Sequence, residues 1–529
     1  MASAVALGAG LQARAHGLAY KWIVLIVVIF GLFMSVLDQT VVNVALPHVI
    51  AVFNADIHQA QLVVTGYALA LAIIIPATGY LMDTYGGKRV WILSLAAFTL
   101  GSALCAFSWN IQALVFFRVL QGLGGGMLMP LGMAMIYRVV PPEERGMTMG
   151  LLGVPVLFAP AIGPSLGGYL VEFVDWRTIF LINLPVGVLG IGMAAALLRE
   201  LPTRSDLTFD MAGFITACVA FGASLIALSN GPTDGWTAPY VLVLLAVSVV
   251  AFAAWIVVEL RVPDPLLDLR LFADFQFTMG MVVTFVVTVA MFGTVFLLPL
   301  FMQNLRGLGA YETGLLLLPQ GITAAVFMPI GGKLFDRLGI RPLMFVGLPL
   351  LAGMTYIFAS LDVTTPDIVT VLVLMGRGVC MGLIFMPLNT AVMNRVPFDK
   401  INRGSSLSNA VRQLFASFGV AIVATILTNR QTFHQAILAE RVTSGSPMVQ
   451  RMLAAAGGVA AQNGWTPDQA KQLLLAMLNG QVLQRAAVLS FDDTFLVLAV
   501  MALVALLPAL FLRTSIVAGA HQASMPVEM

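Results

Sequence analysis

Long runs of apolar residues alternate along the chain with short polar segments. A helix of about 20 apolar residues crosses the roughly 30 Å of hydrocarbon in a bilayer. Lipid offers no hydrogen bond to an open backbone group, so each run is expected to be helical. The pattern predicts fourteen spans, at about residues 22–46, 61–82, 89–108, 111–137, 147–170, 176–198, 211–230, 238–259, 275–302, 313–332, 341–360, 367–393, 405–429 and 490–513.

The first apolar run shares one feature with a secretory signal peptide, because Lys21 precedes it. The run continues through Asp38 to Leu46, however, and lacks a convincing small-x-small cleavage site. We therefore expect an uncleaved first span.

The basic residues orient the spans. With the N-terminus in the cytoplasm, most lysines and arginines of the short loops fall on the cytoplasmic side, as the positive-inside rule requires. Most of the basic residues left on the other side lie in one long segment, at about residues 430–489, and long loops obey the rule weakly. The prediction is a multi-pass protein of the cytoplasmic (inner) membrane with both termini cytoplasmic.

Two segments of the chain repeat each other. Residues 79–89 read G-Y-L-M-D-T-Y-G-G-K-R and residues 332–341 read G-K-L-F-D-R-L-G-I-R. A second match, M-P-L at 129–131 and at 386–388, lies at nearly the same offset. Such a parallel repeat is typical of transporters built from two related six-helix bundles around a central cavity.

The repeat also sets the expected domain organisation. Spans seven and eight fall between the two copies and look inserted. The prediction is an N-terminal six-helix bundle (1–200), two inserted linker helices (201–265) and a C-terminal six-helix bundle (266–529). The last of these contains a long periplasmic loop at about 430–489.

Composition narrows the functional classes. Hydrophobic residues make up 60% of the chain and charged residues only 10%, against roughly 25% charged in soluble domains. The formal net charge is +2 and there is no basic run, so we expect no nucleic-acid partner. The five histidines show no metal-ligand spacing, and no G-x-x-x-x-G-K-[ST] segment is present. We therefore expect no metal or cofactor, and an ion gradient as the energy source.

Two ionisable residues fall inside spans of the first half. Asp38 lies about 16 residues into span one, and Arg118 about seven residues into span four from the opposite side, which gives both a similar depth. An arginine within a span costs about 2.5–3.5 kcal/mol, so it should face the bundle interior and a partner. We expect the two side chains to meet directly or through a water. Burial opposes ionisation of a carboxyl group and an arginine favours it, an opposition suited to a group that gains and loses protons. The alternatives are an interfacial aspartate and a structural arginine that reaches the membrane surface.

Three groups of residues recur as motifs. The cytoplasmic loop motif comprises Gly79, Asp83, Gly86, Lys88 and Arg89, with Asp336, Arg337 and Arg341 in its second copy. Span four continues from Arg118 through Gln121, Gly122 and Gly126. Span five contains Pro160, Gly163, Pro164, Gly167 and Gly168, which permit a bend and close helix approach.

With these motifs, the chain resembles the fourteen-span drug:proton antiporters of the major facilitator superfamily, the EmrB/QacA type, from Leu37 to the last span. The resemblance implies an all-α membrane protein with fourteen transmembrane helices, two six-helix bundles plus two inserted central helices. It also implies that Arg118 is linked to proton movement, with Asp38 as its proton-coupling partner from the depth argument above, and that the span-five residues are the antiporter motif. Thr84 and Gly87 stand where the family usually has basic residues, and Ala159 where it often has glycine.

The loop motif and the remaining charges have alternative interpretations. The loop motif is either a latch that holds one conformation or a simple loop salt bridge. Arg377, in span twelve, is either a gating charge or a structural relic of the duplication. Arg412 is expected to extend to the membrane surface from the cytoplasmic end of span thirteen. The segment 175–187 is similar to one in the same family and is interpreted only as an interface anchor that opens span six.

The segment at about 430–489 is predicted to contain short periplasmic helices at 447–457 and 466–485. They form either a self-packed cap or a docking site for a periplasmic adaptor and an outer-membrane channel.

The leading functional hypothesis is a proton-coupled antiporter, with protons as the coupling ion, that exports small hydrophobic or cationic drugs by alternating access. Its 28 methionines and 33 phenylalanines suit a pocket that accepts several shapes, alongside contact with membrane lipid. The alternatives are an exporter of one specific metabolite or lipid with the same proton motor, and a membrane-embedded sensor or enzyme. No nucleophile and base come together in the spans, so we expect no enzymatic activity.

Overall fold

The computed structural model describes residues 19–204, 206–361, 365–441, 450–451 and 466–513. The long elements of these residues are helices. They are α2 (Tyr20–Phe53), α3 (Ile57–Tyr85), α4 (Gly87–Ala106), α5 (Ile111–Val139), α6 (Arg145–Phe173), α7 (Thr178–Leu181), α8 (Asn183–Leu197), α9 (Met211–Asp234), α10 (Pro239–Arg261), α11 (Phe275–Leu300), α12 (Ala310–Leu338), α13 (Ile340–Phe358), α14 (Asp367–Met393), α15 (Ile401–Arg441), α17 (Pro467–Val504) and α18 (Leu506–Ala509).

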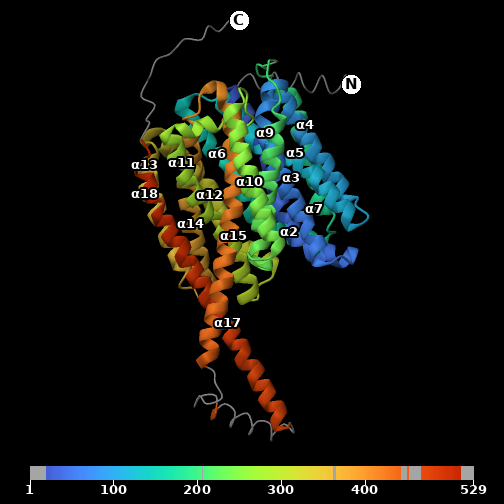
Figure 1. Ribbon diagram of the computed structural model, residues 1–529, viewed down its shortest axis with the longest axis vertical. Helices are drawn as coiled ribbons and strands as arrows, with labels where there is room; N and C mark the ends of the chain where they lie inside the picture. Colours follow the sequence, from blue (N-terminus) through green and yellow to red (C-terminus); the bar gives the residue numbers. More distant parts are fainter. Residues whose placement is uncertain (1–18, 205, 362–364, 442–449, 452–465, 514–529) are drawn as a thin grey trace.

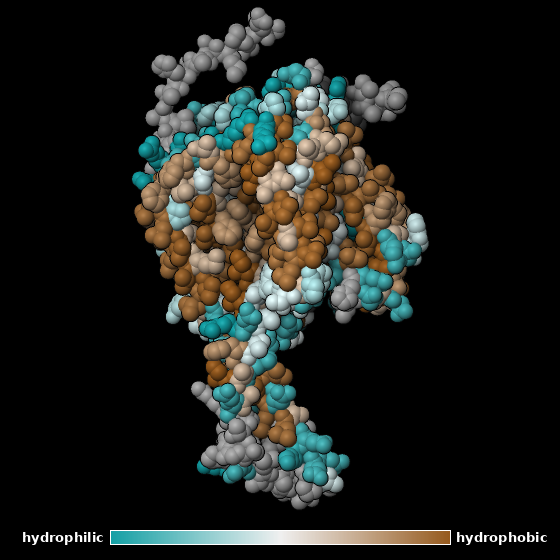
Figure 2. All heavy atoms as spheres, in the orientation of Figure 1, coloured by the Kyte–Doolittle hydropathy of each residue, from teal (hydrophilic) through white to brown (hydrophobic). Residues whose placement is uncertain are grey.

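Among the described residues, 14 helical segments are long and apolar enough to cross a membrane. Each overlaps one of the expected spans, so the all-α, fourteen-span fold class is confirmed. Figure 2 shows the corresponding band of hydrophobic residues on one face of the bundle, bordered by hydrophilic residues at both ends.

Helix boundaries follow local chemistry. Asp56 accepts a hydrogen bond from the Gln59 backbone and starts α3 as part of a capping box. The turns after α3 and α12 contain Gly86 and Gly339, with φ of 91° and 77°. Only glycine adopts such angles without strain, so at each of these two turns the chain can reverse directly into the next span.

The spans form two halves. The N half (α2–α8) is held by packing of α5 against α3 and α4 and of α2 against α6, and the C half (α11–α18) by packing of α14 against α12 and α13 and of α15 against α11 and α17. Between the halves, α6 packs along α12, and α15 packs on α3 and α5. The inserted pair α9 and α10 lies beside α3 and α15 (Figure 1).

One end of the bundle carries the start of α2, the turn after α3 and the end of α18. We call it the terminal face; it is at the top of Figure 1. Two contacts gather distant segments there. Lys21 at the start of α2 pairs with Glu144, and Arg341 donates to the carbonyl of Leu510.

The segment at about 430–489, expected as a loop with short helices, differs from that prediction. α15 continues through residue 430 to 441, and α17 begins at residue 467 and runs without a break into the last span. The two helices project beyond the bundle on the side opposite the terminal face (Figure 1). Asp493, within α17, binds Arg430 at 2.8 Å and His434 at 2.7 Å, both on α15. Most of the helix expected at 447–457 lies outside the described residues.

Candidate functional site: a buried ion pair and an inter-half latch

Asp38 and Arg118 meet in the interior of the N half. Arg118 Nη1 lies 2.6 Å from Asp38 Oδ2, and each residue is 1% exposed. The meeting expected from helix depth is therefore observed. The alternatives of an interfacial aspartate and of an arginine at the membrane surface are wrong, because both side chains are enclosed.

Two amides complete the contacts of the ion pair. Gln121 Nε2 and Asn183 Nδ2 each donate to Asp38 Oδ1 at 2.9 Å, and Gln121 Oε1 accepts from Arg118 Nη1 at 2.7 Å. Asn183 also donates to Ser102 Oγ at 3.0 Å. Asp38 thus accepts three hydrogen bonds, from α5 and α8, without contact with bulk solvent. A buried charge pair requires this completeness, because each unsatisfied oxygen would carry a desolvation cost.

An aromatic ring supports the guanidinium. The Arg118 guanidinium carbon lies 3.9 Å from the centroid of the Tyr67 ring on α3. Stacking of this kind stabilises a desolvated cation. Four helices, α2, α3, α5 and α8, therefore contribute side chains around the ion pair. A change in the charge of Asp38 alters contacts with all four.

The glycines of span four bring these helices close together. A Cβ at Gly122 would lie 2.7 Å from the Tyr67 carbonyl, and one at Gly126 would lie 2.7 Å from the Leu71 carbonyl. Both contacts are with the backbone of α3. The motif therefore sets the distance between α5 and α3, and so the position of Tyr67 beside Arg118.

The span-five residues lie on α6, between α2 of the N half and α12 of the C half. Pro160 and Pro164 are inside the helix. A Cβ at Gly163 would meet Thr40 at 2.1 Å and one at Gly167 would meet Val41 at 3.0 Å, whereas Gly168 faces Tyr311 of α12. The motif thus joins the helix that carries Asp38 to the boundary between the halves.

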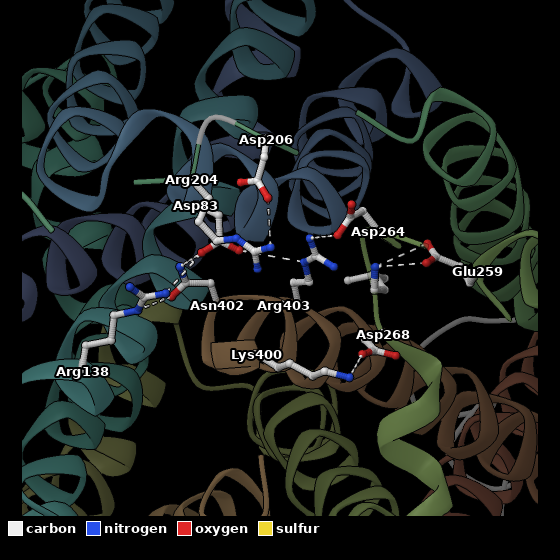
Figure 3. Close-up of polar contacts among 11 residues, drawn as sticks. Asp83, Arg138, Arg204, Asp206, Glu259, Asp264, Asp268, Lys400, Asn402 and Arg403 are labelled. Carbon is white, nitrogen blue, oxygen red and sulfur yellow. Dashed lines mark hydrogen bonds and ion pairs between the residues drawn. The ribbon is translucent and has the colours of Figure 1, made fainter. Parts of the chain in front are cut away.

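Asp83 connects the two halves at the terminal face (Figure 3). It accepts hydrogen bonds from Arg138 at 3.2 Å, on its own half, and from Asn402 on α15. Arg403 of α15 lies 3.9 Å from its other oxygen. Gly79, one turn earlier, allows this approach, because a Cβ there would lie 3.0 Å from the Asn402 carbonyl.

Asp336, the equivalent residue of the second copy, contacts the opposite half in another way. It accepts hydrogen bonds from the backbone N–H groups of Gly146 at 2.8 Å and Met147 at 2.9 Å, in the first turn of α6. A carboxylate at this position also interacts favourably with the helix dipole. Both aspartates of the repeat therefore bridge the halves.

The basic residues of the motif do not bridge the halves. Lys88 donates to the Ala195 carbonyl at 2.7 Å, and Arg89 lies 3.7 Å from Glu200, both contacts within the first half and its adjoining loop. Arg341 contacts Leu510 of the C half. Arg337 forms no ion pair within the described part of the chain. Contacts between the halves therefore come from the two aspartates and not from these basic residues, and the role of the motif as a latch stays a prediction.

Comparison with known proteins identifies the family of this chain. The family model described as "Major Facilitator Superfamily" matches residues 28–420. The chain belongs to the major facilitator superfamily. It is 34% identical over 490 residues to the Bacillus subtilis (strain 168) protein named "Uncharacterized MFS-type transporter YhcA", covering 92% of each chain. It is 32% identical over 452 residues to "Multidrug export protein EmrB" of Escherichia coli (strain K12), covering 85% of this chain and 88% of the relative.

The fold of this chain is also found in a solved structure. The crystal structure of the human organic anion transporter MFSD10 (TETRAN) matches with a TM-score of 0.58 and 13% sequence identity, covering 91% of this chain and 99% of that chain. At this identity the likeness concerns the fold alone.

Sequence reasoning missed several residues of this major facilitator protein. Asp264 binds Arg403 at 3.1 Å and Asp268 binds Lys400 at 2.7 Å, so the loop after the inserted pair is tied to the C half (Figure 3). Glu259 anchors the same loop, 3.3 Å from the Leu267 backbone nitrogen. These acids belong to no repeated motif, and only their clustering at the end of an apolar run could have indicated them.

Two more arginines are buried in the C half. Arg377 is 0% exposed and donates from Nη1 to Thr355 Oγ1 at 2.8 Å, while its Nε and Nη2 have no hydrogen-bond partner among the residues that the structure describes. Its role as a gating charge stays a prediction. Arg412 is 7% exposed and contacts Met133 and Asn409. The expectation that Arg412 reaches the membrane surface is wrong, because its guanidinium points to the boundary between the halves.

Proposed function

We propose that this protein is a proton-coupled antiporter that exports hydrophobic drugs or other toxic compounds across the cytoplasmic membrane by alternating access. The observation that carries the proposal is the buried Asp38–Arg118 pair inside a two-half transporter fold. The relative named "Multidrug export protein EmrB" supports drugs as the cargo and a role in multidrug resistance.

Proton exchange at Asp38 supplies the coupling. A proton on Asp38 removes the charge that balances Arg118, and it also removes an acceptor from Gln121 or Asn183. The network then rearranges around four helices, one of which, α2, packs against α6 and so against the boundary between the halves. Protonation at one site can thereby shift the equilibrium between two arrangements of the halves.

The gradient supplies sufficient free energy for this cycle. A potential of 100 mV contributes about 2.3 kcal/mol per proton and one pH unit about 1.4 kcal/mol. Their sum of about 3.7 kcal/mol supports a gradient of roughly 500-fold for a neutral cargo.

The orientation and the partners complete the proposal. In this proposal both termini face the cytoplasm, and Asp83 and Asp336 hold the two halves together on the cytoplasmic side. Protons alone serve as the coupling ion, without a cofactor. The α15–α17 extension then lies on the periplasmic side, where an adaptor protein and an outer-membrane channel would continue the exit path. The protein carries out transport and no enzymatic reaction.

The test is efflux in proteoliposomes under an imposed pH gradient, with several neutral and charged dyes. Asp38→Asn is expected to abolish gradient-driven efflux while leaving dye binding and energy-independent dye exchange intact, because it removes the group that exchanges the proton but keeps a side chain of the same size with one acceptor oxygen. Asp206→Asn, which neutralises an exposed loop carboxylate, is the matched control and should retain full efflux.

Full gradient-driven efflux by Asp38→Asn would overturn the proposed mechanism. Transport of a single compound with no dye movement would instead identify an exporter of one metabolite or lipid with the same motor.

A further inference from the structure

Arg412 on α15 carries a positive charge that no residue of the described part of the chain balances. Its Nη2 donates to Asn409 Oδ1 at 2.8 Å and contacts Met133 Sδ at 3.6 Å. Neither Nε nor Nη1 has a hydrogen-bond partner within the described residues. Arg403, a buried arginine at the same boundary, differs because it binds Asp83 and Asp264. Arg118, inside the N half, binds Asp38.

This charge lies at the boundary between the two halves, inside the bundle. Arg412 belongs to the C half, whereas Met133 lies on α5 of the N half, so the guanidinium lies between the two halves. It is about three helical turns from Ile401, the start of α15, and is therefore well inside the membrane. An ionisable residue at this depth in a transporter marks a substrate or ion pathway.

A flexible apolar surface adjoins the guanidinium. The Arg412 guanidinium carbon lies 5.9 Å from the centroid of the Phe385 ring. Phe385 packs in a cluster with Met291, Met328, Met381 and Met386 of the C half. Met129, Val156 and Leu157 of the N half pack against the same cluster, which therefore spans the boundary.

Methionine and phenylalanine accommodate apolar molecules of varied shape, because thioether side chains change rotamer at low cost and attract aromatic rings. We call Arg412, Phe385 and these methionines the arginine–methionine site. It combines an adaptable apolar wall with one cation that has free N–H donors.

We propose that the arginine–methionine site binds the cargo and selects hydrophobic molecules that carry an ionised acid group, with Arg412 as the residue that recognises the anion. A carboxylate or phenolate supplies the missing countercharge and accepts hydrogen bonds from Nε and Nη1, while its ring system lies against Phe385 and the methionines. This inference rests on the proposed function, since it names the charge of the cargo that the antiporter exports.

The charge of the cargo has an electrical consequence. If one proton enters as one monoanion leaves, two elementary charges move in the same electrical sense; a neutral cargo moves one and a monocation none. At equal pH on both sides, a membrane potential is therefore expected to drive export of an anion more strongly than export of its neutral analogue, and not to drive export of a cation.

Binding to the purified full-length protein tests the proposal, with three probes that share one ring system: 1-naphthoate, its methyl ester and 1-naphthylmethylammonium. The expected result is that wild type binds naphthoate at least about tenfold more tightly than the ester. Arg412→Gln should weaken naphthoate binding about tenfold and leave ester binding unchanged. Arg412→Lys should retain part of the preference, because it keeps the charge without the guanidinium geometry.

Arg430→Gln is the matched control, because it makes the same change on the same helix at a residue whose side chain is 46% exposed. It should not alter the affinity for any probe. Thermal unfolding and gel-filtration profiles confirm that each variant is folded, and Arg412→Lys keeps the test decisive if Arg412→Gln is unstable.

The inference is overturned if Arg412→Gln leaves naphthoate binding unchanged, if it weakens naphthoate and ester equally, or if wild type prefers the ammonium probe. Transport measurements with the same three probes distinguish failure of the anion site from failure of the proposed antiporter function. Gradient-driven export of the ester or ammonium probe without export of naphthoate would overturn the anion site alone. Arg412-dependent naphthoate binding without gradient-driven export of any probe would support the site and overturn the antiporter.

Discussion

At the scale of single residues, the buried pair shows how a charge is tolerated inside a membrane protein. Asp38 has an arginine and two amides as donors, and Arg118 has a carboxylate, an amide and an aromatic ring. Removing one partner of such a pair leaves the other charge uncompensated, which typically costs about 3–5 kcal/mol. Removing both charges together avoids most of that cost.

Arg118→Gln is therefore expected to be the least stable of three variants. Asp38→Asn leaves a buried arginine that retains Gln121 and Tyr67 as partners, and the double variant Asp38→Asn/Arg118→Gln removes both charges. We expect the double variant to unfold at a higher temperature than Arg118→Gln, in thermal unfolding of the purified protein. A double variant no more stable than Arg118→Gln would show that the charge imbalance is not what destabilises the single variant.

Sequence reasoning reached part of this site. Counting residues from the ends of spans one and four brought Asp38 and Arg118 to one depth, because a helix has a fixed rise. Gln121 belonged to the same motif. Asn183 was missed, since it lies in a segment interpreted only as an interface anchor, and no periodicity reveals which face of α8 turns toward α2. Arg412 was misplaced because depth along a helix does not give the direction of a side chain.

At the scale of helices, close approach of α6 and α12 depends on small residues. Gly332 lies against the backbone of Gly146, and a Cβ at residue 332 would lie 2.0 Å from the Gly146 carbonyl oxygen. Since backbone cannot move aside as a side chain can, any larger residue there must separate the two helices.

Gly332→Ala should destabilise the protein and reduce transport, because it pushes α6 away from α12 and pulls Asp336 away from its backbone donors on α6. Gly353→Ala on α13 is the matched control, since nothing lies within 4 Å of the added Cβ. That change should leave the unfolding temperature the same or slightly higher, as alanine favours helix. Equal unfolding temperatures for Gly332→Ala and wild type would contradict the packing argument.

The lengths of helices were predicted well only within the membrane. Hydropathy located all the spans because it reports the thickness of the bilayer, and Gly86 and Gly339 marked turns between them. Beyond the membrane the same signal fails, because polar residues such as Arg430, after span thirteen, and Arg485, before span fourteen, end the apolar run without ending the helix. This is why α15 and α17 are longer than their predicted spans.

At the scale of the whole molecule, the two copies of the repeated motif make equivalent connections, since Asp83 and Asp336 each reach across the boundary between the halves. The repeat could not indicate Asp264 and Asp268, because they lie in the loop after the inserted helices, which have no counterpart within the duplication. The contacts that join the halves at the terminal face therefore include a third part of the chain.

Asp83→Asn is expected to loosen the terminal face, because it removes the charge that attracts Arg138 and Arg403. Ser405, which is 0% exposed and donates to the Pro130 carbonyl at 2.8 Å, lies just inside that face between α5 and α15. In a background without Cys105, Cys218 and Cys380, a maleimide reagent should label Ser405→Cys several times faster when Asp83→Asn is also present.

The same reporter with Asp206→Asn serves as the comparison, because that change removes an exposed acid that does not bridge the halves. Unchanged labelling in the Asp83→Asn background would mean that Asp83 does not hold the face closed.

Because α15 is one continuous helix, a small rotation at one of its ends moves the other end by a large distance. This helix has 41 residues and so a length of about 62 Å, with Asn402 and Arg403 near one tip and the projecting segment at the other. If the C half tilts by about 10° around its latch contacts, the far tip sweeps roughly 10 Å sideways. Release of the hydrogen bonds near Asn402 would thus move the projecting segment at the far end of α15 by a large distance.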